Sequence, residues 1–220
     1  MRDLLLVGAS GLAREVAAGL GGARQILGYL DEDPGRYGRR LGGLPVLGGL
    51  ELARDLDADL LVCVGSGRAR RGIVDRLAGL GIGADRFGRF VSPGAHLPMG
   101  TPIGPGSILL AGVVVTTDVT VGAHVVVMPN ATLTHDNVLH DYVTIAAGAA
   151  LGGYVVIGPE GYLGMNASVH PRMRIGTGAV VGMGAVVLTD VPPNETWAGV
   201  PARRIRVDGA EPLLTAGARR

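Results

Sequence analysis

The feature that most constrains this chain is an unbroken six-residue repeat. From position 91 to 192 there are 102 residues, which is 17 hexapeptides with no insertion. Every repeat begins with an aliphatic residue: Val91, Leu97, Ile103, Leu109, Val115, Val121, Val127, Leu133, Leu139, Ile145, Leu151, Ile157, Leu163, Val169, Ile175, Val181 and Val187. A helix does not have a period of six, and neither does simple strand alternation. The repeat predicts a parallel β-helix.

Such a helix has three flat sides, so three hexapeptides make one coil of about 18 residues, and coils stack at about 4.8 Å. The aliphatic residue points inward, and Gly or Asn takes corners where φ is positive. Residues 18 apart therefore lie one above the other. Few aromatic residues (4%) and 38 glycines suit a narrow core of small aliphatic side chains.

A strand, turn, helix and second strand precede the repeat. Residues 3–7 are apolar, residues 8–11 read GASG, and an apolar helical stripe begins at Leu12. Residues 25–30 form the next apolar run and end at Asp31. This order predicts a small parallel α/β unit of Rossmann type.

The turn and the acid after the second strand are candidate substrate ligands. Gly8 and Gly11 let the backbone approach a phosphate at a helix N-terminus, and Ser10 lies between them. Asp31 stands where such folds place a carboxylate against ribose or base. The spacing is GxxGxA and not GxGxxG, so a tight turn without a ligand is the alternative.

Further apolar runs at 44–47 and 60–64, with helices near 50–56 and from 67 to about 80, complete the first unit. We therefore expect a Rossmann-like domain over residues 1–88, a β-helix over 89–207 and a flexible tail over 208–220. The fold class is α/β followed by all-β.

Composition narrows the class of protein. The net charge of +1 gives no electrostatic reason to bind nucleic acid or a membrane. The single cysteine, Cys63, lies in an apolar run and is expected to be a buried, inert thiol. No apolar run reaches the roughly 20 residues that a membrane-spanning helix needs, and no signal-peptide pattern is present. A cytoplasmic location is expected.

With these features the chain resembles the hexapeptide-repeat sugar acetyltransferases of the PglD and NeuD type. The resemblance covers about residues 3–205. Its motifs are Gly8-Ala9-Ser10-Gly11, Tyr29-Leu30-Asp31-Glu32-Asp33, Asn130-Ala131-Thr132-Leu133-Thr134-His135-Asp136 and Gly199-Val200-Pro201-Ala202-Arg203. The family acetylates a UDP-4-amino sugar on nitrogen, or sialic acid on oxygen, from acetyl-CoA. The resemblance implies a left-handed β-helix, a nucleotide sugar on the first domain, and a homotrimer with active sites between subunits.

His135 is the candidate general base. Acetyl transfer requires removal of a proton from the attacking amine or hydroxyl, and imidazole exchanges protons near neutral pH. In the family the histidine of this motif has that role, and the following carboxylate, Asp136, orients it. Adjacent strand residues point to opposite faces, so their contact requires a corner. The alternative is a solvated surface histidine.

Four further residues are predicted to bind acetyl-CoA. Gly153 lies 18 residues after His135, and the family glycine there donates its N–H to the acetyl carbonyl; a simple corner glycine is the alternative. Thr144 occupies a position where the family often has a second histidine, near the thioester. Arg203 and Arg204 suit the CoA phosphates. The family often has a histidine at position 12, where this chain has Leu12.

Three other functions remain open. One is O-acetylation of a sialic-acid-type sugar. A second is a metal-dependent, carbonic-anhydrase-like β-helix with His135 and His140 as ligands, although position 99, where a third histidine would lie, is Met. A third is a non-catalytic scaffold. The leading interpretation needs no metal.

Overall fold

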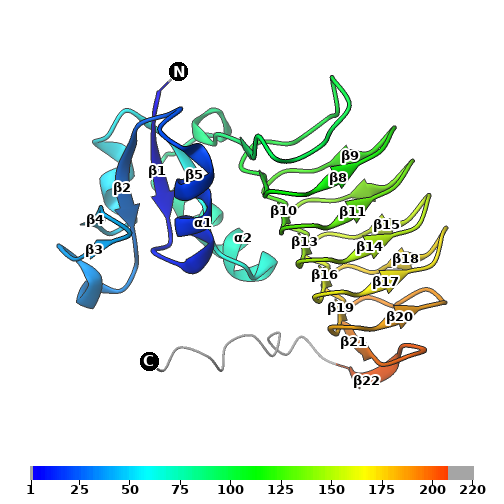
Figure 1. The fold of residues 1–220 in the computed structure, drawn as a ribbon. Helices are drawn as coiled ribbons and strands as arrows, with labels where there is room; N and C mark the ends of the chain where they lie inside the picture. The colour runs from blue at the N-terminus through cyan, green and yellow to red at the C-terminus, as the bar shows by residue number, and fades with distance from the viewer. Residues whose placement is uncertain (1, 208–220) are drawn as a thin grey trace.

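The computed structural model describes residues 2–207. It contains an α/β unit that lies against one side of a β-helix (Figure 1). The predicted tail over 208–220 lies outside the described residues. No described helix is both long and apolar enough to cross a membrane.

The α/β unit is built on a five-stranded sheet in the order β3-β4-β2-β1-β5. All neighbouring strands are parallel except β3 and β4. Its elements are β1 (Asp3–Val7), α1 (Gly11–Leu20), β2 (Ile26–Leu30), η1 (Pro34–Arg36), β3 (Arg40–Leu41), β4 (Leu44–Gly48), η2 (Leu50–Arg54), β5 (Ala58–Val62), α2 (Gly67–Gly79) and η3 (Ala84–Arg86). The strand expected at 60–64 begins and ends two residues earlier.

The repeat folds as a left-handed β-helix whose strands contain two residues each. They are β6 (Phe90–Val91), β7 (Ile108–Leu109), β8 (Val114–Val115), β9 (Thr120–Val121), β10 (Val126–Val127), β11 (Thr132–Leu133), β12 (Val138–Leu139), β13 (Thr144–Ile145), β14 (Ala150–Leu151), β15 (Val156–Ile157), β16 (Tyr162–Leu163), β17 (Ser168–Val169), β18 (Arg174–Ile175), β19 (Val180–Val181) and β20 (Val186–Val187). Two longer strands, β21 (Glu195–Ala198) and β22 (Arg203–Val207), close the end.

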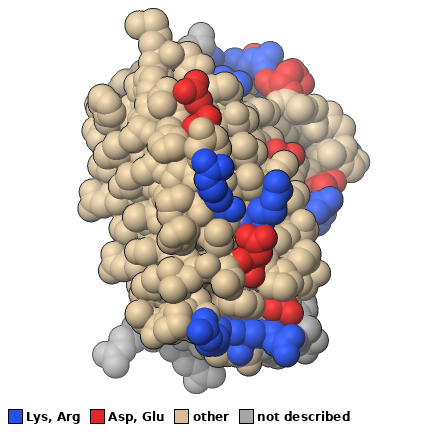
Figure 2. Space-filling view, turned by 90° about the vertical axis from the view of Figure 1, so that its right-hand side faces the viewer, with Lys and Arg blue, Asp and Glu red and all other residues tan. Residues whose placement is uncertain are grey.

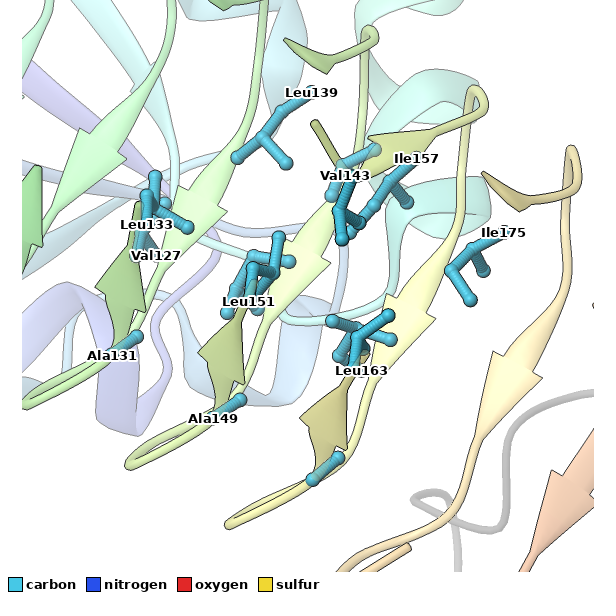
Figure 3. Close-up of a cluster of buried hydrophobic side chains, with 14 of the residues drawn as sticks. Val127, Ala131, Leu133, Leu139, Val143, Ala149, Leu151, Ile157, Leu163 and Ile175 are labelled. Carbon is cyan, nitrogen blue, oxygen red and sulfur yellow. The ribbon is translucent and has the colours of Figure 1, made fainter. Parts of the chain in front are cut away.

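The three sides are three sheets of parallel repeat strands, which we call the β10 side, the β11 side and the β12 side after three consecutive strands, one from each sheet. Paired residues are 18 apart, as in Thr132 with Ala150. Aliphatic side chains from all three sides point into the interior (Figure 3). Non-glycine residues with positive φ occupy many corners, among them Asn130, Asp136 and Tyr154. The predicted period and stacking are therefore confirmed.

The α/β unit covers the outer face of the β10 side, where it packs on apolar side chains. Leu12 and Val16 of α1 belong to the same buried cluster as Ile108 and Val126 of the β-helix. Leu12, at the position where the family often has a histidine, is thus a packing residue in this chain.

A buried arginine joins the two units at the corner between the β12 and β10 sides. Arg70 of α2 is completely buried and donates to the carbonyls of Val64, Gly65, His124, Tyr142 and Val143 and to Thr144 Oγ1. Burial lowers the pKa of Arg70 to about 9, so its guanidinium remains charged at neutral pH. The α/β unit is therefore fixed to the β-helix by both apolar packing and hydrogen bonds.

Candidate active site

His135 and Asp136 meet at the corner between the β11 and β12 sides. Asp136 has a φ of +60°, which turns the chain so that two adjacent side chains can point the same way. Nδ1 of His135 lies 2.7 Å from Oδ2 of Asp136, and the two side chains are 51% and 37% exposed. The corner that their contact requires is present.

This contact sets the histidine tautomer. An ionised carboxylate only accepts hydrogen bonds, so Nδ1 of His135 carries the proton and donates it to Asp136. Nε2 then carries the lone pair, and no described residue is bonded to it. An imidazole held in this way can accept a proton from an approaching nucleophile.

Gly153 lies directly beneath the imidazole, one coil on. A Cβ on Gly153 would come within 2.4 Å of Cε1 and Nε2 of His135, so no side chain fits there. The N–H of Gly153 has no acceptor among the described residues. The structure thus brings His135, Asp136 and Gly153 together, as the 18-residue stacking predicted.

Two neighbours of His135 were not found from the sequence. The ring of Tyr154 meets the imidazole edge-on, with centroids 5.2 Å apart, and Arg172 lies over that ring at 4.7 Å. Both stand at positive-φ corners, one and two coils beyond Asp136. Counting forward from Asp136 in steps of 18 would have revealed them.

The hydroxyl of Ser10, in the glycine turn, is bonded within the protein. Ser10 caps α1 by accepting from Ala13 N–H, and its hydroxyl donates to Cys63 O at 2.7 Å. Gly8 has a φ of +94°, which favours glycine. A Cβ on Gly11 would meet nothing within 4 Å, so the helix N-terminus is open at Gly11.

Asp31 reaches back to the same turn. Its Oδ2 accepts from Ala9 N–H at 2.7 Å and from Arg36 at 3.3 Å, and its Oδ1 accepts from Asp33 N–H. The Asp31 side chain is 11% exposed. Asp31 therefore holds the turn, while Arg36, which the sequence did not single out, places a half-exposed guanidinium beside it.

A cavity of about 360 Å³ opens at this edge of the α/β unit. It is lined by Tyr37, Glu51 and the Glu32–Arg76 ion pair, with others. Parallel α/β sheets bind ligands at the carboxyl ends of their strands. A larger cavity of about 510 Å³ lies between the end of α1 and residues 87–91, and it contains none of the predicted site residues.

The position of Thr144 does not support the predicted role at the cofactor. Thr144 is fully buried, and its hydroxyl donates to Gly65 O and accepts from Arg70. It lies on the β10 side, under the α/β unit and away from the His135 corner. The reason is that the docked unit covers this side, which the six-residue period does not reveal.

Arg203 and Arg204 lie at the far end of the β-helix, on β22. Both are exposed; Arg204 contacts Glu195 at 3.4 Å, and Arg203 donates to a backbone carbonyl. Figure 2 shows basic side chains in a row at this end; above them, charged side chains lie along the middle and right of the face, and its left part is uncharged. Trp197 of β21 packs against the β-helix core.

The glycine turn and His135 do not meet within one chain. The α/β unit lies on the β10 side and its corner with the β12 side, whereas His135 stands at the opposite corner, between the β11 and β12 sides.

His140 follows β12, at the other end of that side. No three His, Cys, Asp or Glu side chains within residues 2–207 could hold a metal ion.

The buried thiol of Cys63 takes no part in this arrangement. Its side chain is completely buried, and burial raises its pKa far above the ordinary value. The prediction of an inert thiol is confirmed.

Neither models of protein families nor curated proteins match this chain. Solved structures do. The acetyltransferase domain of PglB from Neisseria gonorrhoeae, in complex with acetyl coenzyme A, is 33% identical, with a TM-score of 0.82 over 93% of this chain and 99% of that domain. The chain belongs to the hexapeptide-repeat sugar acetyltransferases. PerB from Caulobacter crescentus, in complex with CoA and GDP-perosamine, is 27% identical (TM-score 0.84, 92% and 96% covered). WeeI from Acinetobacter baumannii is 28% identical (TM-score 0.83, 93% and 100% covered).

Membership of the family confirms the resemblance and the left-handed β-helix, and it identifies the chain as an acyltransferase that uses acetyl-CoA. The roles of individual residues stay predictions.

Proposed function

We propose that this acetyltransferase transfers the acetyl group of acetyl-CoA to the amino group of a nucleotide-linked amino sugar. The observation that carries the proposal is the His135–Asp136 pair, whose unbonded Nε2 lies next to Gly153. The GDP-perosamine bound by PerB supports an amino sugar on a nucleotide as the acceptor.

The reaction needs three things from the protein. Nε2 of His135 accepts a proton as the sugar amine forms its bond to the thioester carbonyl carbon. The N–H of Gly153 donates to the oxyanion on that carbon. When the carbon–sulfur bond breaks, the imidazolium returns the proton to the departing thiolate, and CoA leaves as the thiol.

The rest of the molecule would bind the two substrates. Gly11, at the open N-terminus of α1, and Arg36 provide groups that favour a diphosphate, which gives the Rossmann-like unit its role. The cavity beside Glu32 has room for a base. Arg203 and Arg204 suit the phosphates of CoA.

Because the nucleotide-sugar unit and His135 face different ways in one chain, we infer that each active site is shared by two subunits of a homotrimer. Three prisms packed about a threefold axis place a side of one beside a corner of the next. The uncharged left part of the face in Figure 2 is suited to such packing. A cytoplasmic location stays a prediction from the sequence.

The test is release of free CoA thiol by the purified protein. Acetyl-CoA is mixed with GDP- and UDP-linked 4-amino-4,6-dideoxy sugars and with sialic acid, and His135→Ala serves as the inactive reference. Turnover with a nucleotide amino sugar that is lost in His135→Ala supports the proposal. Turnover with sialic acid alone would replace it by O-acetylation. A protein that binds no CoA would overturn it.

A further inference from the structure

One buried polar side chain beneath the His135 corner has no partner for half of its amide. Asn137 is completely buried in the β-helix, where the residues one coil before and one coil after it are Val119 and Val155. Its Nδ2 donates to Gly152 O at 2.8 Å, while its Oδ1 is buried without a hydrogen-bond partner. An amide that is only half satisfied is costly in an apolar core, so stability does not explain its presence.

The contact with Gly152 fixes the direction of one peptide unit. In a trans peptide the C=O and the following N–H point in opposite directions. Because the carbonyl of Gly152 is held inward by Asn137, the N–H of Gly153 must point outward, beside the imidazole that covers Gly153.

The molecule contains a second copy of this arrangement, which supports the geometry. At the corner between the β12 and β10 sides, the hydroxyl of Ser107 donates to Gly122 O at 2.8 Å. The N–H of the next residue, Ala123, points outward and donates to the carboxylate of Asp141 at 2.8 Å, 18 residues on. An inward-held glycine carbonyl thus presents the following N–H to an anionic oxygen.

The two corners differ in what receives that N–H. The residue that corresponds to Asp141, 18 residues after Gly153, is Pro171, which has no side-chain acceptor. The N–H of Gly153 is therefore unpaired within the described residues, next to the proposed base. The Ala123 corner supplies its own anionic acceptor, whereas the Gly153 corner leaves its N–H for another molecule.

We propose that Asn137 is a positioning residue for acetyl transfer, which holds the Gly152–Gly153 peptide so that the N–H of Gly153 can donate to the oxyanion of the reacting thioester. This inference rests on the proposed function. Asn137 touches neither substrate; it acts through the backbone of Gly153.

The decisive variant is Asn137→Val, because valine is the residue above and below it in the same column. We expect kcat to fall about 10- to 100-fold, somewhat less than when an oxyanion donor is removed outright, with KM for acetyl-CoA unchanged. Ser107→Val is the matched control: it removes the same kind of interior donor, far from His135, and should leave kcat unchanged. Asn137→Ser can donate as Ser107 does and should recover part of the rate.

Circular dichroism and the oligomeric state of each variant are measured first. If Asn137→Val does not fold, Asn137→Cys takes its place, since cysteine is small, apolar and a weak donor. A folded Asn137→Val or Asn137→Cys with wild-type kcat, or an equal loss in Ser107→Val, would overturn the inference and leave the proposed function standing. Absence of transfer by the wild-type protein would overturn both.

Discussion

The glycine turn and the His135 corner are both rich in polar groups, but they use them in opposite ways. At the turn, Ser10 and Asp31 are bonded to the backbone around them. At the corner, Nε2 of His135 and the N–H of Gly153 have no partner among the described residues. Polar groups that satisfy one another build structure, whereas polar groups left open can act on a substrate. We therefore assign acid–base chemistry to the corner, and to Ser10 and Asp31 the shape of the turn.

The largest expected effect is a loss of transferase activity without a loss of the fold. His135→Ala removes the proposed base, and we expect activity to fall about 10²- to 10⁴-fold. The side chain is half exposed, so the melting temperature should hardly change. His140→Ala, at an exposed histidine five residues on, is the control and should retain activity. If His135→Ala were as active as His140→Ala, His135 would not be the base.

The second prediction concerns Arg70, which fixes the α/β unit to the β-helix. Arg70→Met deletes the guanidinium that binds carbonyls of both units, leaving those carbonyls unpaired. Because each buried carbonyl left unpaired costs about 1–3 kcal/mol, we expect a loss of about 3–5 kcal/mol in the free energy of unfolding, measured by denaturant titration. Arg71→Ala, which removes a surface ion pair with Glu160, should have a much smaller effect. Similar losses would mean that the units are held by apolar packing alone.

The third prediction concerns the same contact between the α/β unit and the β-helix, and how the free energy of unfolding depends on pH. His124 is buried between Phe87 and Tyr142, and burial, aided by the charge of Arg70, lowers its pKa from 6.5 to about 4. The unfolded chain takes up a proton below about pH 6.5 and the folded chain does not, so stability present above that pH is lost as the pH falls. From pH 7 to pH 5 the loss attributable to His124 should be about 2 kcal/mol.

Denaturant titrations of wild-type protein and His124→Asn at both pH values measure that loss. Asparagine tolerates the positive φ of 54° at this corner and does not titrate in this range. The pH dependence should shrink in His124→Asn; an unchanged dependence would show that other groups cause it.

The smallest effect tests the structural role of the turn. Ser10→Ala removes the cap of α1 and the bond to Cys63 O, and we expect a loss of about 1 kcal/mol in unfolding free energy. Ser66→Ala is the matched control, because Ser66 caps α2 through a single contact of 3.3 Å with Ala69 N–H. A large loss of kcat in Ser10→Ala without loss of stability would contradict the comparison.

The six-residue period predicted more of the corner than of the turn. The period fixes which residues are neighbours 18 positions apart, so the sequence alone predicts that Gly153 lies beneath His135. The same count would have found Tyr154 and Arg172. In the α/β unit, no such rule relates Asp31 to Arg36, because their contact depends on how the loop after β2 turns.

Thr144 shows where the period itself is insufficient. Its position in the repeat predicts that its side chain points outward, and an outward side chain normally contacts solvent or a ligand. Here the α/β unit covers that side. The apolar outward residues Ile108 and Val126, on the same side, were the signal that it would be covered.

The most direct test of an active site shared between subunits mixes two inactive variants. Gly11→Asp places a carboxylate where the diphosphate is expected; its Cβ meets nothing within 4 Å, and an acid is favourable at a helix N-terminus. His135→Ala lacks the base. If one site combines the turn of one chain with the His135 corner of another, each variant alone is inactive. Mixed trimers assembled at random from equal amounts should then recover about a quarter of wild-type activity. A mixture that forms trimers but stays inactive would show that both parts of the site come from a single chain.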